Sequence, residues 1–203
     1  SGVVSGDLYL DAAGDVGKGW VRLSARKAQM RMAGIALRGN IDINTQLRRA
    51  DMARRSFAVD GSTVKLDNIS FSEPGGETRS GWWARINLPR ARMDWNKPLA
   101  VAGSADVTMK DVGFLLSLFS RQREYPKWVY KLIDSGQAQV KGKVQWNNDT
   151  LLLDQIDASN QRFDLLARMR LRGKSRNGSL YAKWGPLSMG VEMDGTKSKF
   201  HPV

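Results

Sequence analysis

The sequence predicts a mainly β protein, a long antiparallel meander that is curved or sandwich-like, with a short helical pair near residues 111–135. Three observations predict this fold. Apolar residues alternate with polar ones along most of the chain, and turn-forming residues separate the alternating stretches. The gaps between the stretches are too short for the crossover helices that a parallel sheet requires.

The expected strands follow one another along the whole chain. Each is identified by apolar residues at every second position, which a strand places on one face. The main sets are Leu8 and Leu10; Val21, Leu23 and Ala25; Ala28, Met30 and Met32; Ile35, Leu37, Ile41 and Ile43; Trp82, Ala84, Ile86 and Leu88; Val101, Ala105, Val107 and Met109; Phe163, Leu165, Ala167, Met169 and Leu171.

One strand pattern occurs twice with the same change of phase. Thr63-Val-Lys-Leu-Asp-Asn-Ile-Ser70 and Thr150-Leu-Leu-Leu-Asp-Gln-Ile-Asp157 align without a gap, and in both the alternation shifts after the aspartate. Because alternate residues of a strand face opposite ways, the shift predicts a β-bulge or bend at Asp67-Asn68 and at Asp154-Gln155.

Further matches extend this pattern to two diverged repeat units, at about residues 53–103 and 140–191, within one β-rich domain or fragment covering 1–203. Asp60-Gly61 and Asn147-Asn148 accept the conformations of tight turns, so each unit is expected to start as a two-stranded hairpin. Both units also contain a Trp-Pro-Leu step, at Trp95 to Leu99 and at Trp184 to Leu187.

Between the two units the apolar period becomes helical. Asp111 is a favourable N-cap for the first helix, and a second is expected between Pro126 and Gly136. The pair either plugs an open end of the sheet or places apolar side chains against a lipid or membrane interface. The candidate contact residues are Phe114, Leu118, Phe119 and Trp128.

The chain carries a net charge of +12, which favours binding to polyanions or to anionic membrane surfaces. Arg168, Arg170 and Arg172 alternate with the apolar residues of one expected strand. They are candidates for contact with anionic groups, and the alternative is a solvated strand face.

The chain has no cysteine, which excludes disulfides and thiolate metal sites, and no apolar run long enough to cross a bilayer. It begins with Ser-Gly rather than Met. This start indicates an excised fragment or a tag remnant, and an anchor or export signal could lie outside the sequence.

Residues suited to catalysis are few. The single histidine, His201, lies near the end of the chain, so Ser-His-Asp, Cys-His and His-rich zinc arrangements cannot be assembled. Gly14 to Gly19 lacks the spacing of a phosphate-binding loop and is interpreted as a hairpin turn. Asp67 and Asp154 are candidate paired carboxylates because they are equivalent in the two units, but local hydrogen bonding to the backbone at a bulge is the favoured explanation for both.

The bulge motifs at 66–69 and 153–156, the step from Trp95 through Pro98-Leu99 into 101–111, and the segment 136–146 resemble AsmA-like proteins of the Gram-negative envelope. The resemblance implies a curved sheet with an apolar inner face. It also implies a periplasmic location within an inner-membrane-anchored protein, and a part in lipid transport or outer-membrane assembly. It carries over no catalytic residue and no cofactor.

The leading hypothesis is a non-enzymatic envelope module whose apolar β-surface handles lipid, with a basic rim near phosphate groups. Its partners would be phospholipid or a membrane surface, together with other envelope proteins. The alternative is a basic β-protein that binds a polyanion, either nucleic acid or an acidic glycan. Salt separates the two, because polyanion binding weakens steeply as salt rises and acyl-chain binding does not. A carboxylate-dependent hydrolase is the least favoured class.

Overall fold

A computed structural model of the chain describes residues 2–10, 16–32, 35–51, 53–72, 78–119, 136–173, 175–195 and 197–202. Within these residues a single antiparallel sheet of 14 strands contains almost all of the regular structure. The strands are β1 (Gly2–Leu10), β2 (Val16–Met32), β3 (Ile35–Leu47), β4 (Arg49–Asp51), β5 (Ser56–Ala58), β6 (Ser62–Ser72), β7 (Thr78–Asp94), β8 (Ala100–Met109), β9 (Ala138–Asn147), β10 (Thr150–Ser159), β11 (Phe163–Arg172), β12 (Ser175–Trp184), β13 (Leu187–Asp194) and β14 (Lys197–Pro202).

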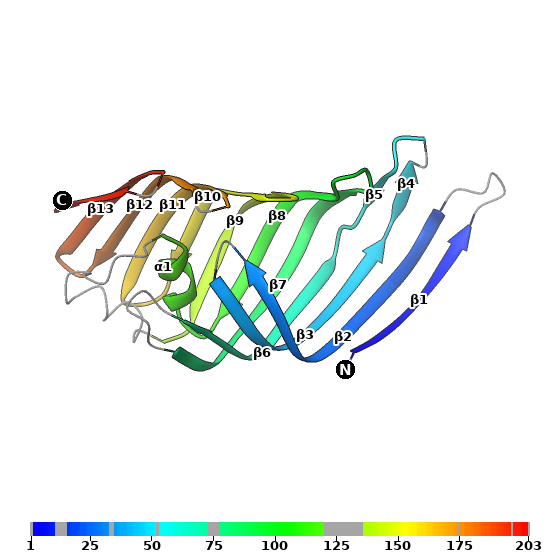
Figure 1. The fold of residues 1–203 in the computed structure, drawn as a ribbon, viewed down its shortest axis with the longest axis horizontal. Helices are drawn as coiled ribbons and strands as arrows, with labels where there is room; N and C mark the ends of the chain where they lie inside the picture. Colours follow the sequence, from blue (N-terminus) through cyan, green and yellow to red (C-terminus); the bar gives the residue numbers. More distant parts are fainter. Residues whose placement is uncertain are drawn as a thin grey trace.

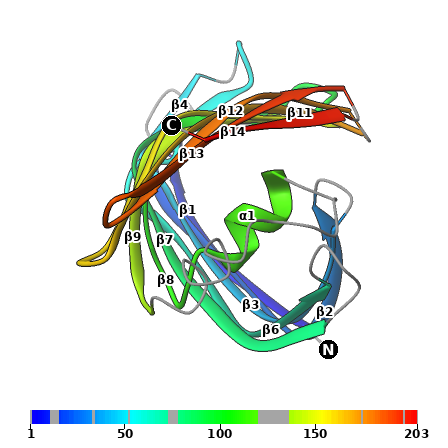
Figure 2. The ribbon, with the colours of Figure 1, turned by 90° about the vertical axis from the view of Figure 1, so that its left-hand side faces the viewer.

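The strands follow the predicted meander. Their order is β1-β2-β3-β6-β7-β8-β9-β10-β11-β12-β13-β14, and the short strands β4 and β5 lie off this path, with β5 pairing to β7. The sheet is strongly curved, and the helix α1 (Gly113–Phe119) lies on its concave side (Figures 1 and 2). The predicted mainly β, antiparallel fold is confirmed, as one curved sheet rather than a sandwich. We call the concave side the inner face and the convex side the outer face.

The first of the two expected helices is present. α1 follows β8, and the carboxylate Oδ1 of Asp111 accepts a hydrogen bond of 2.9 Å from the backbone N–H of Gly113, as predicted for an N-cap. The second expected helix, between Pro126 and Gly136, lies almost wholly outside the described residues.

The two predicted bulges are confirmed. The pairing register shifts between Leu66 and Ile69 and between Leu153 and Ile156. The residues after the two aspartates adopt positive φ angles, 52° at Asn68 and 51° at Gln155. Each bulge turns the alternation by one residue, so apolar side chains on both sides of it stay on the inner face.

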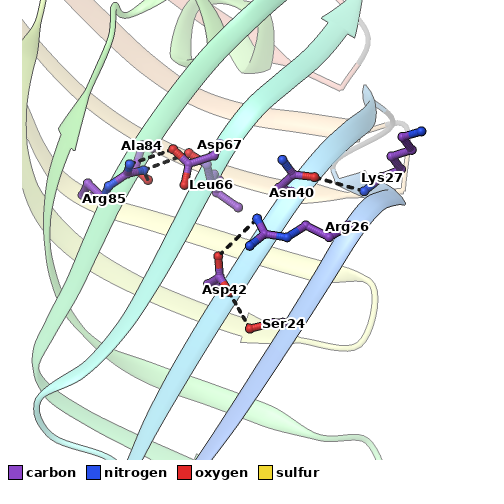
Figure 3. A network of polar contacts seen from close by, with 9 residues as sticks. All are labelled: Ser24, Arg26, Lys27, Asn40, Asp42, Leu66, Asp67, Ala84 and Arg85. Carbon is purple, nitrogen blue, oxygen red and sulfur yellow. Dashed lines mark hydrogen bonds and ion pairs between the residues drawn. The ribbon is translucent and has the colours of Figure 1, made fainter. Parts of the chain in front are cut away.

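A third bulge of the same kind lies in β2. The register shifts between Ala25 and Ala28, and Lys27 has φ of 53°. The backbone N–H of Lys27 donates to Oδ1 of Asn40 at 3.1 Å, which satisfies the amide that the bulge removes from the ladder (Figure 3).

Gly39 lies between two of these bulges. It pairs with Ala28 of β2 on one side, and on the other side a Cβ at position 39 would lie 2.7 Å from the backbone oxygen of Asn68. Such a Cβ would also meet Cα of Ile69 at 2.9 Å. Only glycine allows the backbones of β3 and β6 to approach this closely.

The expected hairpin is present in the second unit and absent from the first. β9 and β10 pair directly, whereas β5 pairs with β4 and β7 and does not contact β6 as a ladder partner. Residues 56–72 instead run along β7 as one interrupted strand, because Asp60 and its neighbours bond to β7. The backbone N–H of Ala91 donates to Oδ1 of Asp60 at 2.7 Å, and that of Val59 donates to the oxygen of Ala91 at 2.8 Å.

The two Trp-Pro-Leu steps are not equivalent in space. The first connects β7 to β8 and the second connects β12 to β13, which places them at opposite ends of an alternating antiparallel sheet. The structural likeness between the units is therefore centred on the bulged strands β6 and β10.

Replacing Gly39 by alanine is expected to lower the free energy of unfolding by about 1–3 kcal/mol, because the new Cβ overlaps backbone atoms that cannot rotate away. Gly142→Ala is the matched control, since a Cβ there meets mainly the flexible Cδ1 of Ile156. Urea unfolding followed by tryptophan fluorescence measures both changes. An equal loss in the two variants would contradict the proposed role of Gly39.

Candidate functional site

One line of paired residues crosses the inner face and is apolar on every strand from β1 to β13. The pairing registers connect each member to the next. We call this line the apolar row, and its members are Val4, Leu23, Ile43, Val64, Ile86, Val107, Val140, Ala158, Leu165, Ala182 and Met189.

The apolar row is open at one end and closed at the other. The exposed fraction is 68% for Val4 and 37% for Leu23, and falls to 5% for Val140 and 0% for Leu165. Between these extremes, Ile43, Val64, Ile86 and Val107 are partly buried. We call the part from β1 to β8 the open part. It is exposed on β1 and β2, and from β3 to β8 its side chains are half-buried and pack against the core, which contains the closed part and residues of α1.

The open part is long enough for an acyl chain. Five inter-strand steps separate Val4 from Val107, and steps of about 4.8 Å give roughly 24 Å along the sheet. One leaflet of a bilayer has a hydrocarbon depth of about 15 Å, half of the full core. An extended lipid tail could therefore lie on these residues along its whole length.

The adjacent line of residues faces the other way and is almost entirely polar. The registers connect Val3, Ser24, Asp42, Lys65, Arg85, Thr108, Gln139, Ser159, Asp164, Lys183 and Ser188 on the outer face. Side chains along this line form hydrogen bonds to one another and to residues at the bulges. Arg85 donates to Oδ1 of Asp67 at 2.7 Å and to the backbone oxygen of Leu66 at 3.1 Å, and Ser24 donates to Asp42 (Figure 3).

The helix α1 closes one part of the inner face through aromatic contacts. The ring of Phe114 lies 5.5 Å from that of Phe71 and 5.3 Å from that of Trp82. Asp111 anchors the start of the helix to β7, because its Oδ1 lies 3.4 Å from Nη1 of Arg79 and its backbone oxygen accepts from Nε1 of Trp82 at 3.1 Å. These contacts hold α1 against the concave side of the sheet.

Of the four candidate lipid-contact residues, the structure describes the side chain of one. Phe114, a candidate for lipid contact, is buried, with an exposed fraction of 8%. Its aromatic neighbours explain this placement, and they favour the interpretation of α1 as a plug. Leu118 and Phe119 belong to α1, but their side chains lie outside the described part of the chain, as does the whole of Trp128.

The residues expected to contact anionic groups lie on the outer face. Arg168, Arg170 and Arg172 are exposed and alternate with buried residues along β11. Nε of Arg172 donates to Oδ2 of Asp149 at 3.2 Å, and this hydrogen bond holds the pKa of Asp149 below its ordinary value. The three arginines therefore lie on the opposite side of the sheet from the apolar row.

The structure separates the two bulge aspartates. β7, β8 and β9 lie between β6 and β10, so the strands that carry Asp67 and Asp154 are separated by four inter-strand steps, roughly 19 Å across the sheet, and the two residues are also offset along the strands. A glycosidase pair lies within about 9.5 Å. His201 lies 3.6 Å from Glu192 on β13, and both side chains are exposed.

No group of three potential metal ligands occurs among the described residues. Within the same residues, no helix is long and apolar enough to cross a bilayer. A hollow in the outer face, at the β1–β2 edge, is lined by Gly2, Val3, Ser5, Arg22, Ser24 and Arg26.

Sequence reasoning missed three features of the site. It did not foresee the Arg79–Asp111 pair, the close approach at Gly39, or the bulge at Lys27. The last had a visible signal, because the alternation of Val21, Leu23 and Ala25 changes phase at Ala28. The other two depend on contacts between strands that only the fold establishes.

Comparisons of the chain with protein-family models, with curated proteins and with solved structures found no match. The resemblance to AsmA-like proteins therefore rests on the sequence patterns alone.

Replacing Asp111 by alanine is expected to lower the free energy of unfolding by about 2–3 kcal/mol, because both the helix cap and the partner of Arg79 are lost. Asp111→Asn keeps an oxygen that can accept from Gly113 and should lose less. Chemical unfolding measures the two variants, and an undiminished stability of Asp111→Ala would show that α1 is held by other contacts.

Replacing Arg172 by alanine is expected to raise the pKa of Asp149 toward its ordinary value of 3.8, because the hydrogen bond that lowers it is removed. A lowered pKa means that the pair stabilises the fold above this pH and that the effect is lost as the pH falls. Carboxyl NMR titration measures the shift, with Arg170→Ala as a control that should leave Asp149 unchanged.

Proposed function

We propose that this chain is a non-enzymatic envelope module that shelters lipid acyl chains on the open part of its apolar row. The observation that carries the proposal is the unbroken run of apolar side chains from Val4 to Val107, which are exposed on β1 and β2 and only partly buried from β3 to β8. Periplasmic location and work in lipid transport or outer-membrane assembly are the context that the AsmA-like pattern implies.

An acyl chain fits this surface better than a soluble metabolite does. The row has no charged side chain between β1 and β8. The free energy of binding would therefore come from burial of CH2 groups and not from hydrogen bonds or ion pairs to polar atoms. Each buried CH2 contributes about 0.8 kcal/mol before the costs of ordering the chain. A surface that contacts only hydrocarbon would bind the tails of many different lipids. It would also allow a bound tail to move from one strand to the next.

The basic residues of β11 are placed to contact phosphate groups on the outer face, away from the sheltered tail. Arg168, Arg170 and Arg172 face outward, so they could contact phosphates of a neighbouring membrane or head groups beyond the sheet margin, rather than those of a tail lying on the inner face. Their position also suits the polyanion alternative, in which the outer face is the binding surface and the apolar row has no ligand.

Replacing Val64 by glutamate is expected to weaken binding of a fluorescent fatty acid by about tenfold or more, because an unpaired charge would sit in the middle of the open apolar row. Thr63→Glu adds the same charge to the same strand on the outer face and should bind as the original chain does. Fluorescence titration at low and high salt measures both.

Leu23→Glu is a second variant at a more exposed position, where we expect a charge to leave the fold intact. Circular dichroism and thermal unfolding establish that each variant remains folded. Equal affinity of Val64→Glu, Leu23→Glu and Thr63→Glu for the fatty acid would exclude the inner face as its site. Salt-sensitive binding to DNA, abolished by Arg168→Glu and Arg170→Glu, would favour the alternative function.

A further inference from the structure

Exposed apolar side chains gather on the edge strand β1. It holds four of the ten large apolar side chains that are exposed in the described part of the chain: Val3 and Val4 at 68%, Leu8 and Tyr9 at 57%. Val4 and Leu8 belong to the inner face, and Val3 and Tyr9 alternate with them on the outer face. Among the described strands only β2 pairs with β1.

The two edges of the sheet differ in how they resist pairing. β14, at the far edge, contains Lys197, Lys199 and Pro202, which are the residue types that blunt an edge against another strand. β1 contains Asp7 as its single charged residue and has no proline or lysine. Within the described residues β1 pairs on one side only, so its other side can accept a further strand, and its exposed side chains suit one that is apolar on both faces.

We propose that the partner is a second copy of this chain, paired antiparallel through β1 with the two Gly6 residues opposite each other on a twofold axis. The pattern of polar and apolar residues in β1 is symmetric about Gly6. The polar residues Ser5 and Asp7 flank it, followed on each side by the apolar pairs Val4 and Leu8, and Val3 and Tyr9. Such a self-complementary strand makes a closed, isologous dimer.

In this register apolar residues of the two copies lie opposite each other on both faces of the sheet. Val4 of one copy lies opposite Leu8 of the second copy on the inner face, and Val3 lies opposite Tyr9 on the outer face. Aromatic and β-branched residues directly opposite each other stabilise a strand pair. Asp7 faces Ser5 of the second copy, whose cross-strand neighbour on the same face is Arg22, so the acidic side chain gains a nearby positive charge.

The dimer joins the two inner faces into one. The twofold axis is perpendicular to the sheet, so the concave sides of both copies face the same way. The line Ile43, Leu23, Val4 of one copy continues into Leu8, Gly19 and Leu47 of the other, because those residues are cross-strand partners. This inference concerns the edge strand and holds whether or not the inner face binds lipid.

Sedimentation equilibrium of the full chain tests the dimer, which should show twice the monomer mass of 22.6 kDa. Val4→Lys with Leu8→Lys should give a monomer, because each lysine would face another across the axis. The matched control replaces two exposed apolar residues far from β1, Trp95→Lys with Leu187→Lys, and should remain a dimer. Mixing the lysine variant with Val4→Glu, Leu8→Glu chains should restore the dimer.

Cysteine crosslinking tests the register, and the chain has no cysteine of its own. An equimolar mixture of Val4→Cys chains and Leu8→Cys chains should form a disulfide dimer on oxidation, since the paired Cβ atoms lie about 5 Å apart. Either variant alone should not. A monomer at all concentrations, a dimer that survives the lysine substitutions, or crosslinking of Val4→Cys with itself would each overturn the proposal.

Discussion

A slip of one residue in any strand would turn its apolar side chains to the outer face, so cross-strand register is the constraint on which the rest of this sheet depends. The bulges at Lys27, Asn68 and Gln155 bend their strands and increase the local twist, and the apolar side chains on both sides of each bulge stay on the inner face. Gly39 of β3 lets the backbone of the bulged strand β6 approach closely. The apolar row and the polar line beside it are the direct result.

Much of this architecture follows from the sequence. Alternation gives the strands, the shared change of phase after Asp67 and Asp154 gives two bulges, and Asp111 gives the start of α1. The partners could not be predicted, because a pattern of period two does not say which strand lies beside which. The mistaken hairpin before β6 shows this limit. Asp60 and Gly61 do form a turn, closed by the N–H of Ser62 and the oxygen of Val59, but β5 and β6 on either side of it both pair with the distant strand β7, whose Ala91 N–H donates to Asp60.

The site has the same mixture of predictable and unpredictable features. An apolar inner face is implied by alternation alone, and the exposure of Arg168, Arg170 and Arg172 follows from the same pattern. The burial of Phe114 does not, because it depends on how Phe71 and Trp82 meet the helix. A surface of this kind offers continuity and shelter rather than reactive groups, which suits hydrocarbon that moves along the sheet.

Mass spectrometry of lipid extracted from the purified, denatured chain tests the central claim most directly. The account predicts acyl lipid in stoichiometric amount, absent from a control protein of similar size and charge prepared in parallel. It also predicts that the amount does not change when the protein is washed at high salt before extraction. Extracts with no more acyl lipid than the control, from protein that is folded, would contradict the account.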